Sequence, residues 1–234
     1  NYGGVSDEDL QQKIINDIRD SPGHVFCLQE ATETFCEQLR VPWTPENCVR
    51  RRPAKRSPNP HYLVVRGAEK GKSTAVAVRN SVFKAIRRDL FILQDAGTYQ
   101  EEKGGPTTET RNRLMFCTAK FRTHYFDDEY TASDEMGIAV AHLHNWCARK
   151  ATITGEVHYS NFFDWLGMGI LEFRSRVLCM DAGMALWTVV PELRARGFMV
   201  SMAAFFPFFQ DMPGPRAKVD SLGIFVIGET KKLK

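Results

Sequence analysis

The chain has 234 residues, of which 43% are hydrophobic and 25% charged, and this is the composition of an ordinary globular protein. Such a length can bury a full core as one large domain or at most two small ones. No stretch approaches the roughly 18 uninterrupted apolar residues of a membrane-spanning helix, and the net charge of +3 is too small to imply nucleic acid by itself.

Helices and strands alternate at the start of the chain. Ser6 is expected to cap a helix with leucine and isoleucine along one face, and Ser21-Pro22-Gly23 ends it. Val25–Leu28 is a short apolar run of the kind found in buried strands, and it leads into Glu30. A second helix is predicted over Thr32–Arg40.

The remainder is expected to be mainly strands. Apolar runs bounded by turn residues predict strands over Tyr62–Val65, Thr74–Val78, Phe83–Asp89, Leu114–Phe121, Gly137–His144, Val177–Met180 and Val219–Ile227. Helices are predicted over Ser160–Phe173 and about Leu186–Arg196. Pro42–Pro60, with five prolines, and the polar segment Asp95–Thr110 are predicted loops. Phe205–Phe209 is expected to be an exposed or partner-covered loop, with a core strand as the alternative.

Strands outnumber helices, and several helices lie between strands. This order favours two sheets packed together with helices outside. We therefore expect an α+β fold, a four-layer α/β/β/α sandwich of two mixed sheets packed face to face, as a single domain over residues 1–234.

The six cysteines are scattered and form no close CxxC pair, which argues against a zinc knuckle. Cys27, Cys117 and Cys179 fall in apolar runs, so free thiols in a reducing intracellular compartment are the simpler interpretation, with a Cys36–Cys48 bridge as the alternative. The chain starts at Asn1 instead of methionine, so we expect a processed protein or a fragment, and an organelle remains open as its location.

Polar residues at predicted strand ends are the candidate functional groups: Asn1, Glu30, His142, Asp181 and Asp220. Carboxylates and an amide oxygen are ligands that Mg²⁺ prefers, and a histidine nearby can contact a phosphate or move a proton. Together they would suit metal-assisted phosphodiester hydrolysis. The alternatives are structural: carboxylates that cap helices, a core histidine, and an aspartate on an edge strand.

The order of these motifs resembles the exonuclease–endonuclease–phosphatase superfamily, which includes deoxyribonucleases and apurinic endonucleases. The similarity runs from end to end, and "LQE" and "HLH" are its specific motifs. The segments that carry it are Asn1, Val25–Ala31 (VFCLQEA), Ala75–Ser81, Ile138–Trp146 (IAVAHLHNW), Leu178–Gly183 (LCMDAG, for the family's "GDFN") and Val219–Val226 (VDSLGIFV, for "IDYIFV").

The resemblance implies a role for each matching residue. Glu30 would be the metal carboxylate with Asn1 beside it, and Mg²⁺ would be the cofactor of an active enzyme. His142 would contact the scissile phosphate, Asp181 would orient or deprotonate the attacking water, and Asp220 would assist at the metal or hold a histidine. His144 and the position of Gly183 would bind phosphate.

The chain departs from the family at three positions. Gly183 replaces the asparagine that should hold a phosphate oxygen, and Met180 replaces a glycine and is expected to crowd the pocket. No histidine follows His158, whereas the family ends with an Asp-His pair that stabilises the transition state. Losing one such donor typically costs roughly 100–1,000-fold in rate.

Three functions follow as hypotheses. The first is a degenerate member that keeps the nuclease-like fold, has lost most hydrolysis and binds a protein partner in an assembly, and the aromatic segment Phe205–Phe209 would suit that contact. The second is a working Mg²⁺-dependent phosphodiesterase or endonuclease. The third is a nucleic-acid-binding module without cleavage, using the basic cluster Arg50, Arg51, Arg52, Lys55 and Arg56.

Overall fold

The structure is a computed structural model, and it describes residues 7–41, 62–100, 107–122, 134–143, 160–182, 186–209 and 219–228. The chain divides into two compact units. The first comprises residues 1–87 and 119–135, and the second comprises residues 88–118 and 136–234. The single domain predicted over residues 1–234 stays a prediction.

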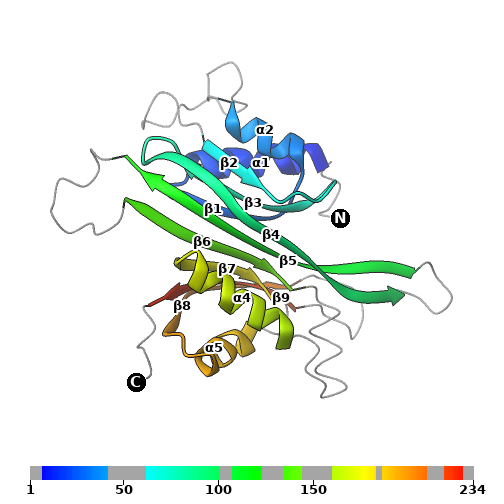
Figure 1. The fold of residues 1–234 in the computed structure, drawn as a ribbon. Coiled ribbons are helices and arrows are strands. Elements are labelled where there is room, and N and C mark those ends of the chain that lie inside the picture. The colour runs from blue at the N-terminus through cyan, green and yellow to red at the C-terminus, as the bar shows by residue number, and fades with distance from the viewer. Residues whose placement is uncertain are drawn as a thin grey trace. The chain divides into compact units, whose positions relative to one another are not determined.

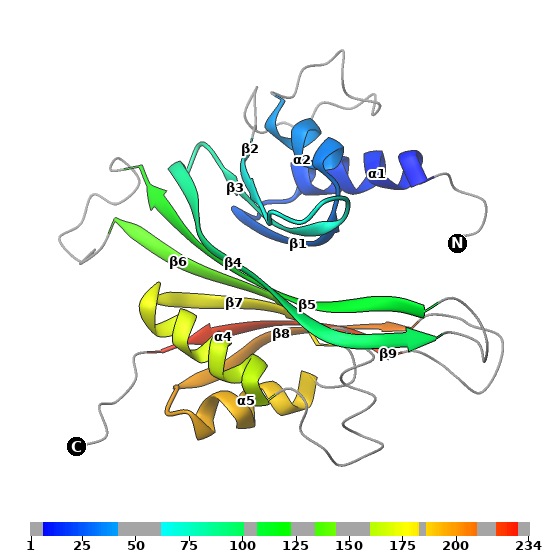
Figure 2. The same cartoon turned by 45° about the vertical axis from the view of Figure 1, so that its right-hand side comes forward.

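The first unit contains a three-stranded antiparallel sheet in the order β1-β3-β2. Its strands are β1 (Val25–Ala31), β2 (Tyr62–Arg66) and β3 (Ser73–Arg79). Two helices, α1 (Asp7–Asp20) and α2 (Glu33–Arg40), cover one face of this sheet (Figures 1 and 2). The predicted elements of this region are therefore present, with boundaries shifted by a few residues.

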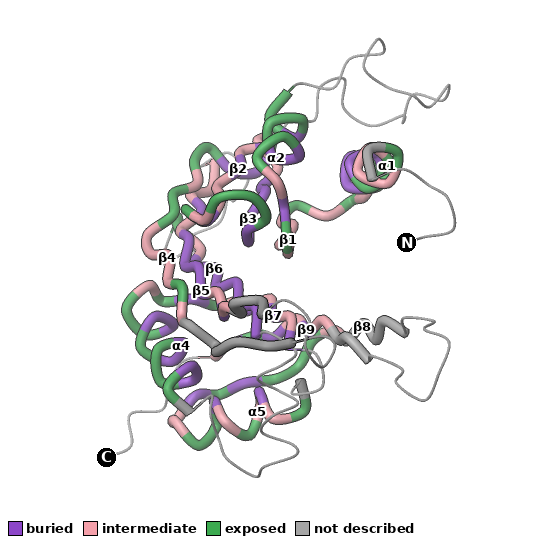
Figure 3. Tube along the Cα trace, turned by 90° about the vertical axis from the view of Figure 1, so that its right-hand side faces the viewer, coloured by how far each residue is buried: buried purple, intermediate pink, exposed green. Residues whose placement is uncertain are grey.

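Apolar periodicity explains how these helices dock. Phe35 and Leu39 of α2 and Ile15 and Ile18 of α1 are buried, and they pack with alternate residues of the strands. Figure 3 shows buried residues along β3 and on one side of α1. The small side chains of Ala75 and Ala77 in β3 face this cluster, and they let the helices approach the sheet closely.

A hydrogen-bonded network joins the sheet to the carboxyl end of α1. The buried Tyr62 hydroxyl donates to the carbonyl of Ile18 at 2.9 Å, and Arg79 Nη2 donates to the same hydroxyl at 3.1 Å. Arg79 Nη2 also donates to the carbonyl of Ser21 at 2.5 Å. Burial raises the pKa of Tyr62, so the phenol stays protonated and keeps its role as donor to Ile18.

Removing that hydroxyl is expected to cost stability. Tyr62→Phe leaves the Ile18 carbonyl with only the longer bond from the Ser21 amide, at 3.3 Å, and removes an acceptor from Arg79. We therefore expect the free energy of unfolding to fall by about 1.5 kcal/mol. Urea denaturation measures the change. Because both residues belong to one network, Arg79→Met combined with Tyr62→Phe should cost less than the sum of the two single changes. Additive costs would contradict the network.

The second unit contains most of a six-stranded sheet in the order β4-β5-β6-β7-β9-β8 (Figure 1). The strands of this sheet are β4 (Phe83–Gln100), β5 (Thr107–Phe121), β6 (Glu135–His142), β7 (Ser175–Asp181), β8 (Val200–Phe209) and β9 (Val219–Ile227). The first residues of β4 (83–87), the last of β5 (119–121) and Glu135 of β6 belong to the first unit. The sheet is mixed, because β6 runs parallel to β7 whereas β7 and β8 pair antiparallel with β9. Helices α4 (Ser160–Glu172) and α5 (Leu186–Ala195) cover one face (Figure 2).

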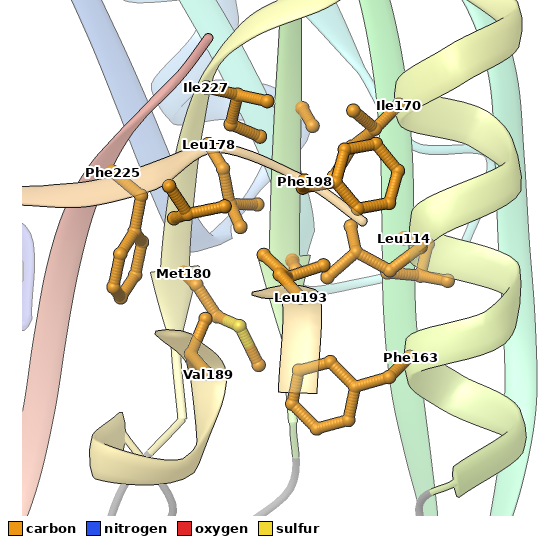
Figure 4. Close-up of a cluster of buried hydrophobic side chains, with 14 of the residues drawn as sticks. Leu114, Phe163, Ile170, Leu178, Met180, Val189, Leu193, Phe198, Phe225 and Ile227 are labelled. Atoms are coloured by element: carbon orange, nitrogen blue, oxygen red, sulfur yellow. The ribbon is translucent and has the colours of Figure 1, made fainter. Parts of the chain in front are cut away.

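The core of this unit lies between the sheet and these two helices (Figure 4). Alternate residues of each central strand point into it, and the helices contribute the residues of their apolar stripes. Representative members are Leu114, Phe116, Ala141, Phe162, Phe163, Ile170, Leu178, Met180, Val189, Leu193 and Phe225. Because side chains alternate along a strand, the residues next to these in sequence lie on the opposite face of the sheet.

Two segments predicted as loops contain strands in the structure. Residues 95–100 and 107–110 of the predicted loop Asp95–Thr110 belong to β4 and β5, and residues 101–106 lie outside the described residues. Phe205–Phe209 forms the end of β8 and pairs with Val219–Gly223 of β9, so the strand alternative is correct. In both places sheet neighbours satisfy the backbone groups, and local composition does not reveal that pairing.

The predicted α+β class, with two sheets and helices against them, is confirmed. The three-stranded sheet is antiparallel, so the description as a mixed sheet applies to the larger one. The face-to-face packing of the two sheets stays a prediction. Among the described residues, no helix has the length and apolar character required to cross a membrane.

Candidate functional site

The carboxyl ends of β6 and β7 bring two predicted site residues side by side. These neighbouring strands are parallel, and His142 is the register partner of Asp181. The amide of Leu143 donates to the carbonyl of Asp181 at 2.8 Å, so the pairing continues to the end of the strands. On the other side of β7, Asp181 pairs with Leu222 of antiparallel β9, which places the backbone of Asp220 at the same edge of the sheet.

His142 and Asp181 share one face of the sheet, opposite the α4 and α5 core. Nε2 of His142 lies 3.8 Å from Oδ2 of Asp181, with the two side chains 10% and 22% exposed. This distance is longer than a hydrogen bond, so it is a polar contact between two largely buried groups. Arg113 of β5 lies on the same face, because its neighbour Leu114 points into the helix-side core.

Arg113 determines which imidazole nitrogen carries the proton. Its Nη1 lies 2.7 Å from Nδ1 of His142. A guanidinium has only donors, so Arg113 donates and Nδ1 accepts. While that bond holds, Nδ1 has no proton, the ring is a neutral imidazole, and its N–H is on Nε2, toward Asp181. In this arrangement Arg113 is positively charged, His142 is neutral and Asp181 is negatively charged.

Met180 does not crowd this polar group, contrary to the sequence-based expectation. Its side chain is 1% exposed and packs in the helix-side core, where Figure 4 shows it beside Val189 of α5. The reason is the alternation of side chains along β7, which sends Met180 and Asp181 to opposite faces. Met180 therefore belongs to the core of this unit, and the side chains of His142 and Asp181 lie on the other face of the sheet.

Glu30 occupies an unusual backbone position in the first unit. The register of β1 against β3 shifts between Leu28 and Ala31, which is a β-bulge with one extra residue in β1. Glu30 lies in this bulge with φ +54°, in the left-handed region that residues with a side chain rarely adopt. Its side chain is exposed. Such strain persists only where surrounding contacts enforce it, and it clusters at functional sites.

The contacts that hold the bulge come from both neighbouring elements. Thr32 caps α2 directly after the bulge, and its Oγ1 accepts from the amide of Phe35 at 3.2 Å. Nε of Arg66, at the end of β2, donates to the carbonyl of Ala31 at 3.2 Å. The carboxylate of Glu30 itself lies 3.5 Å from Nζ of Lys72, in the β2–β3 hairpin.

The structure describes only some of the predicted site residues. It places His142 and Asp181 together and the backbone of Asp220 at their edge, whereas Glu30 lies in the other unit. The remaining predicted residues lie outside the described part of the chain: Asn1, His144, Gly183 and the basic cluster Arg50, Arg51, Arg52, Lys55 and Arg56. Their predicted roles stay predictions.

Sequence reasoning missed Arg113, Arg66 and Lys72. A signal for Arg113 was present, since it directly precedes the apolar run Leu114–Cys117 of β5. A charged residue on a face whose neighbours are buried needs a partner, and this requirement points to a polar group on the adjacent strand. The roles of Arg66 and Lys72 depend on the bulge at Glu30 and on the β2–β3 hairpin. No residue pattern in the sequence predicts that these two features lie beside each other.

The predicted Mg²⁺ site is represented by one carboxylate only. Among the described residues, no three histidine, cysteine, aspartate or glutamate side chains gather closely enough to hold a metal ion. Glu30 has the hard oxygen donors that Mg²⁺ prefers, but its described neighbour is the ammonium of Lys72. The donor set in the described residues therefore does not fit a divalent ion, and the predicted partner Asn1 lies outside them.

Comparison with known proteins identifies similar folds only. No protein-family profile and no curated protein matches the chain. A humanised D. rerio TDP2 is 12% identical, and the match covers 97% of this chain and 95% of that chain at a TM-score of 0.46. An endonuclease/exonuclease/phosphatase family protein from Bacteroides thetaiotaomicron is 12% identical, with 92% and 73% covered at a TM-score of 0.45.

A mannosyl-6-phosphatase from Bacteroides thetaiotaomicron is 13% identical, with 93% of this chain and 76% of that chain covered at a TM-score of 0.46. The family predicted from the order of the motifs is thus represented among the similar structures. With TM-scores below 0.5, these three likenesses carry no inference about function.

Proposed function

We propose that the chain is a nuclease-like domain of the endonuclease/exonuclease/phosphatase type that has lost most of its phosphodiester hydrolysis. Its role is that of a binding or structural subunit in a larger assembly. The proposal combines the order of the sequence motifs with the state of the polar groups that those motifs supply. The substitution of glycine for the family's asparagine at position 183 points in the same direction.

One observation carries this proposal: the 2.7 Å contact between Arg113 and His142. A histidine that serves as a general acid, or that adds positive charge beside a phosphate, does so as an imidazolium. Arg113 occupies Nδ1 as a donor, so the ring stays neutral and keeps a single N–H, which faces Asp181. Oδ2 of the aspartate lies 3.8 Å from that nitrogen. A neutral ring between Arg113 and Asp181 therefore favours a structural role for this group over a reaction centre.

The outer face of α4 supports a role in binding. Trp165, Met168 and Leu171 follow one another at three-residue spacing on this helix and are 45%, 66% and 57% exposed. Residues three apart lie on the same side of a helix, so they form an apolar stripe. Large exposed apolar side chains, with tryptophan and methionine among them, are typical of protein–protein contacts.

Hydrolysis assays test the proposal. The protein is incubated with Mg²⁺ or Mn²⁺ and with abasic, single-stranded and duplex DNA and a small aryl phosphodiester. We expect the rates of the wild type, Glu30→Gln and Asp181→Asn to be the same within error. Wild-type turnover that Glu30→Gln abolishes would overturn the proposal. Glu69→Gln, in the β2–β3 turn, serves as the control, because it removes a carboxylate charge without loss of a predicted site residue.

A Mg²⁺-dependent phosphodiester hydrolase is the second candidate, and the bulge at Glu30 favours it. A strained backbone that exposes a carboxylate is a feature that folding alone does not require. In such an enzyme, Mg²⁺ bound at Glu30 would polarise a phosphoryl oxygen. The same assays separate the two candidates, because only the hydrolase predicts a metal-dependent rate that Glu30→Gln removes.

Nucleic-acid binding without cleavage remains a third proposal, and it depends on the sequence alone. Five basic residues lie between Arg50 and Arg56 and would neutralise phosphates, so binding should weaken steeply as salt rises. Reversal of the charges at Arg50, Arg51 and Arg52 should remove that affinity. Binding to single-stranded or duplex DNA at several salt concentrations measures it.

A further inference from the structure

We propose that Lys72 supplies, from within the chain, the positive charge that a divalent cation would bring to Glu30. The carboxylate of Glu30 is then balanced without a metal. This inference deepens the proposed function, on which it rests, by naming the group that stands in the place of the ion. The observation behind it is the distance of 3.5 Å between Lys72 Nζ and Glu30 Oε2.

A surface ion pair of this kind is often incidental, but here a single guanidinium connects the backbone on both sides of it. Nε of Arg66 donates to the carbonyl of Ala31, the residue after Glu30, at 3.2 Å. Nη2 of the same residue donates to the carbonyl of Gly71, the residue before Lys72. Arg66 therefore links the bulge to the hairpin turn directly beside each partner of the pair.

The position of Arg66 makes it suitable as a clamp. Its side chain is 10% exposed, whereas those of Lys72 and Glu30 are 66% and 53% exposed. It also lies 3.6 Å from Oε2 of Glu33, in the first turn of α2. A buried guanidinium with several carbonyl and carboxylate partners holds its geometry, because its donors form a rigid planar fork.

The backbone has a positive φ at Glu30 itself and at Gly71, the residue before Lys72. Glu30 has φ +54° in the bulge, and Gly71 has φ +77° in the hairpin turn. At Gly71 a side chain would be strained, since this left-handed conformation favours glycine. The two irregular backbone positions, joined by Arg66, point Lys72 and Glu30 at each other. Ordering both chains in advance lowers the entropy cost that makes most exposed ion pairs weak.

The ammonium competes with a divalent cation in two ways. It occupies an oxygen of the carboxylate as a donor, and its charge repels a second cation at the same place. Removing Lys72 should therefore strengthen cation binding at Glu30. From the usual strength of exposed ion pairs, we expect Lys72→Ala to raise the affinity for Mn²⁺ by about two- to fivefold.

Titration of the full chain with Mn²⁺ alone, followed by electron paramagnetic resonance of the free ion, tests the inference. The variants are Lys72→Ala, Glu30→Gln and the two changes combined. Lys70→Ala is the matched control, because Lys70 is an exposed lysine in the same hairpin and its removal changes the net charge equally. We expect tighter Mn²⁺ binding for Lys72→Ala than for Lys70→Ala, and loss of the gain when Glu30→Gln is added.

Three outcomes would overturn the inference: equal effects of the two lysine changes, no measurable Mn²⁺ binding by Lys72→Ala, or strong wild-type binding that Glu30→Gln removes. A further variant tests the clamp. Arg66→Gln should reduce the difference between Lys72→Ala and Lys70→Ala, because the pair is no longer held. The proposed lack of hydrolysis is measured by turnover and this inference by ion binding, so either can fail while the other stands.

Discussion

Replacing Gly169 by alanine is expected to lower the free energy of unfolding by about 3 kcal/mol, because it overpacks the core between α4 and β5. A Cβ at this position would lie 2.2, 2.5 and 2.6 Å from three ring atoms of Phe116. The ring cannot move away easily, since Phe116 is fully buried and stacks on Phe173 with ring centroids 5.5 Å apart. Thermal denaturation followed by circular dichroism measures the loss.

Gly167 provides the matched control on the same helix. Alanine is the better helix former at either position by about 1 kcal/mol, so propensity cancels between the two variants. A Cβ at Gly167 would lie 3.2 Å from the ring of Phe198, which needs to yield by only a few tenths of an ångström. Gly167→Ala should therefore be close to neutral. Equal stabilities of the two variants would contradict the packing of α4 described above.

These glycines also illustrate what the sequence could and could not predict. Helical periodicity correctly predicts a helix over Ser160–Phe173, although Gly167 and Gly169 lower its helix propensity. Glycine is required at position 169 because the ring of Phe116, more than fifty positions earlier in the chain on β5, leaves no space for a Cβ. Such a requirement is tertiary, and local propensity carries no information about it.

The same distinction applies to the candidate site. The resemblance of the motifs predicts that strand ends carry the functional groups, and the register of β6 and β7 brings His142 and Asp181 together. The partner that sets the state of the histidine, Arg113, comes from β5, whose pairing in the sheet is not encoded in any short motif. Spacing thus locates the groups, whereas the contacts between strands decide what they can do.

Two arginines act in a parallel manner in the two units. Arg113 occupies an imidazole nitrogen that a working histidine would need, and Arg66 holds a lysine against a carboxylate that a metal would need. In each case a cation from the chain itself contacts a residue that the sequence motifs assign to the candidate site. The proposed loss of hydrolysis is compatible with retention of the fold, because polar groups with partners stabilise a structure that groups without partners would strain.

Alkaline conditions are expected to destabilise the second unit through the thiol of Cys117. Burial, with a smaller contribution from the charge of Asp89, raises the pKa of Cys117 from 9.0 to about 12. The thiol is fully buried, and its charged form is therefore disfavoured in the folded state. A group with a raised folded pKa contributes stability that is complete below its unfolded pKa. That contribution is lost as the pH rises from about 9 toward 12.

The loss follows from the size of the shift. Between pH 8 and pH 11 it amounts to about 2.5 kcal/mol, since each pH unit costs about 1.4 kcal/mol once the unfolded thiol is ionised. Urea denaturation at pH 8 and pH 11 measures it against Cys117→Ala, which lacks the group and should lose about that much less over the same interval. Other groups titrate equally in both proteins, so the difference isolates the thiol. Cys36, whose pKa burial raises to about 11, provides a second case in the first unit, where Cys36→Ala should reduce the alkaline loss by a smaller amount. Parallel stability curves for the wild type and Cys117→Ala would mean that this thiol is open to solvent, contrary to the packing of β5.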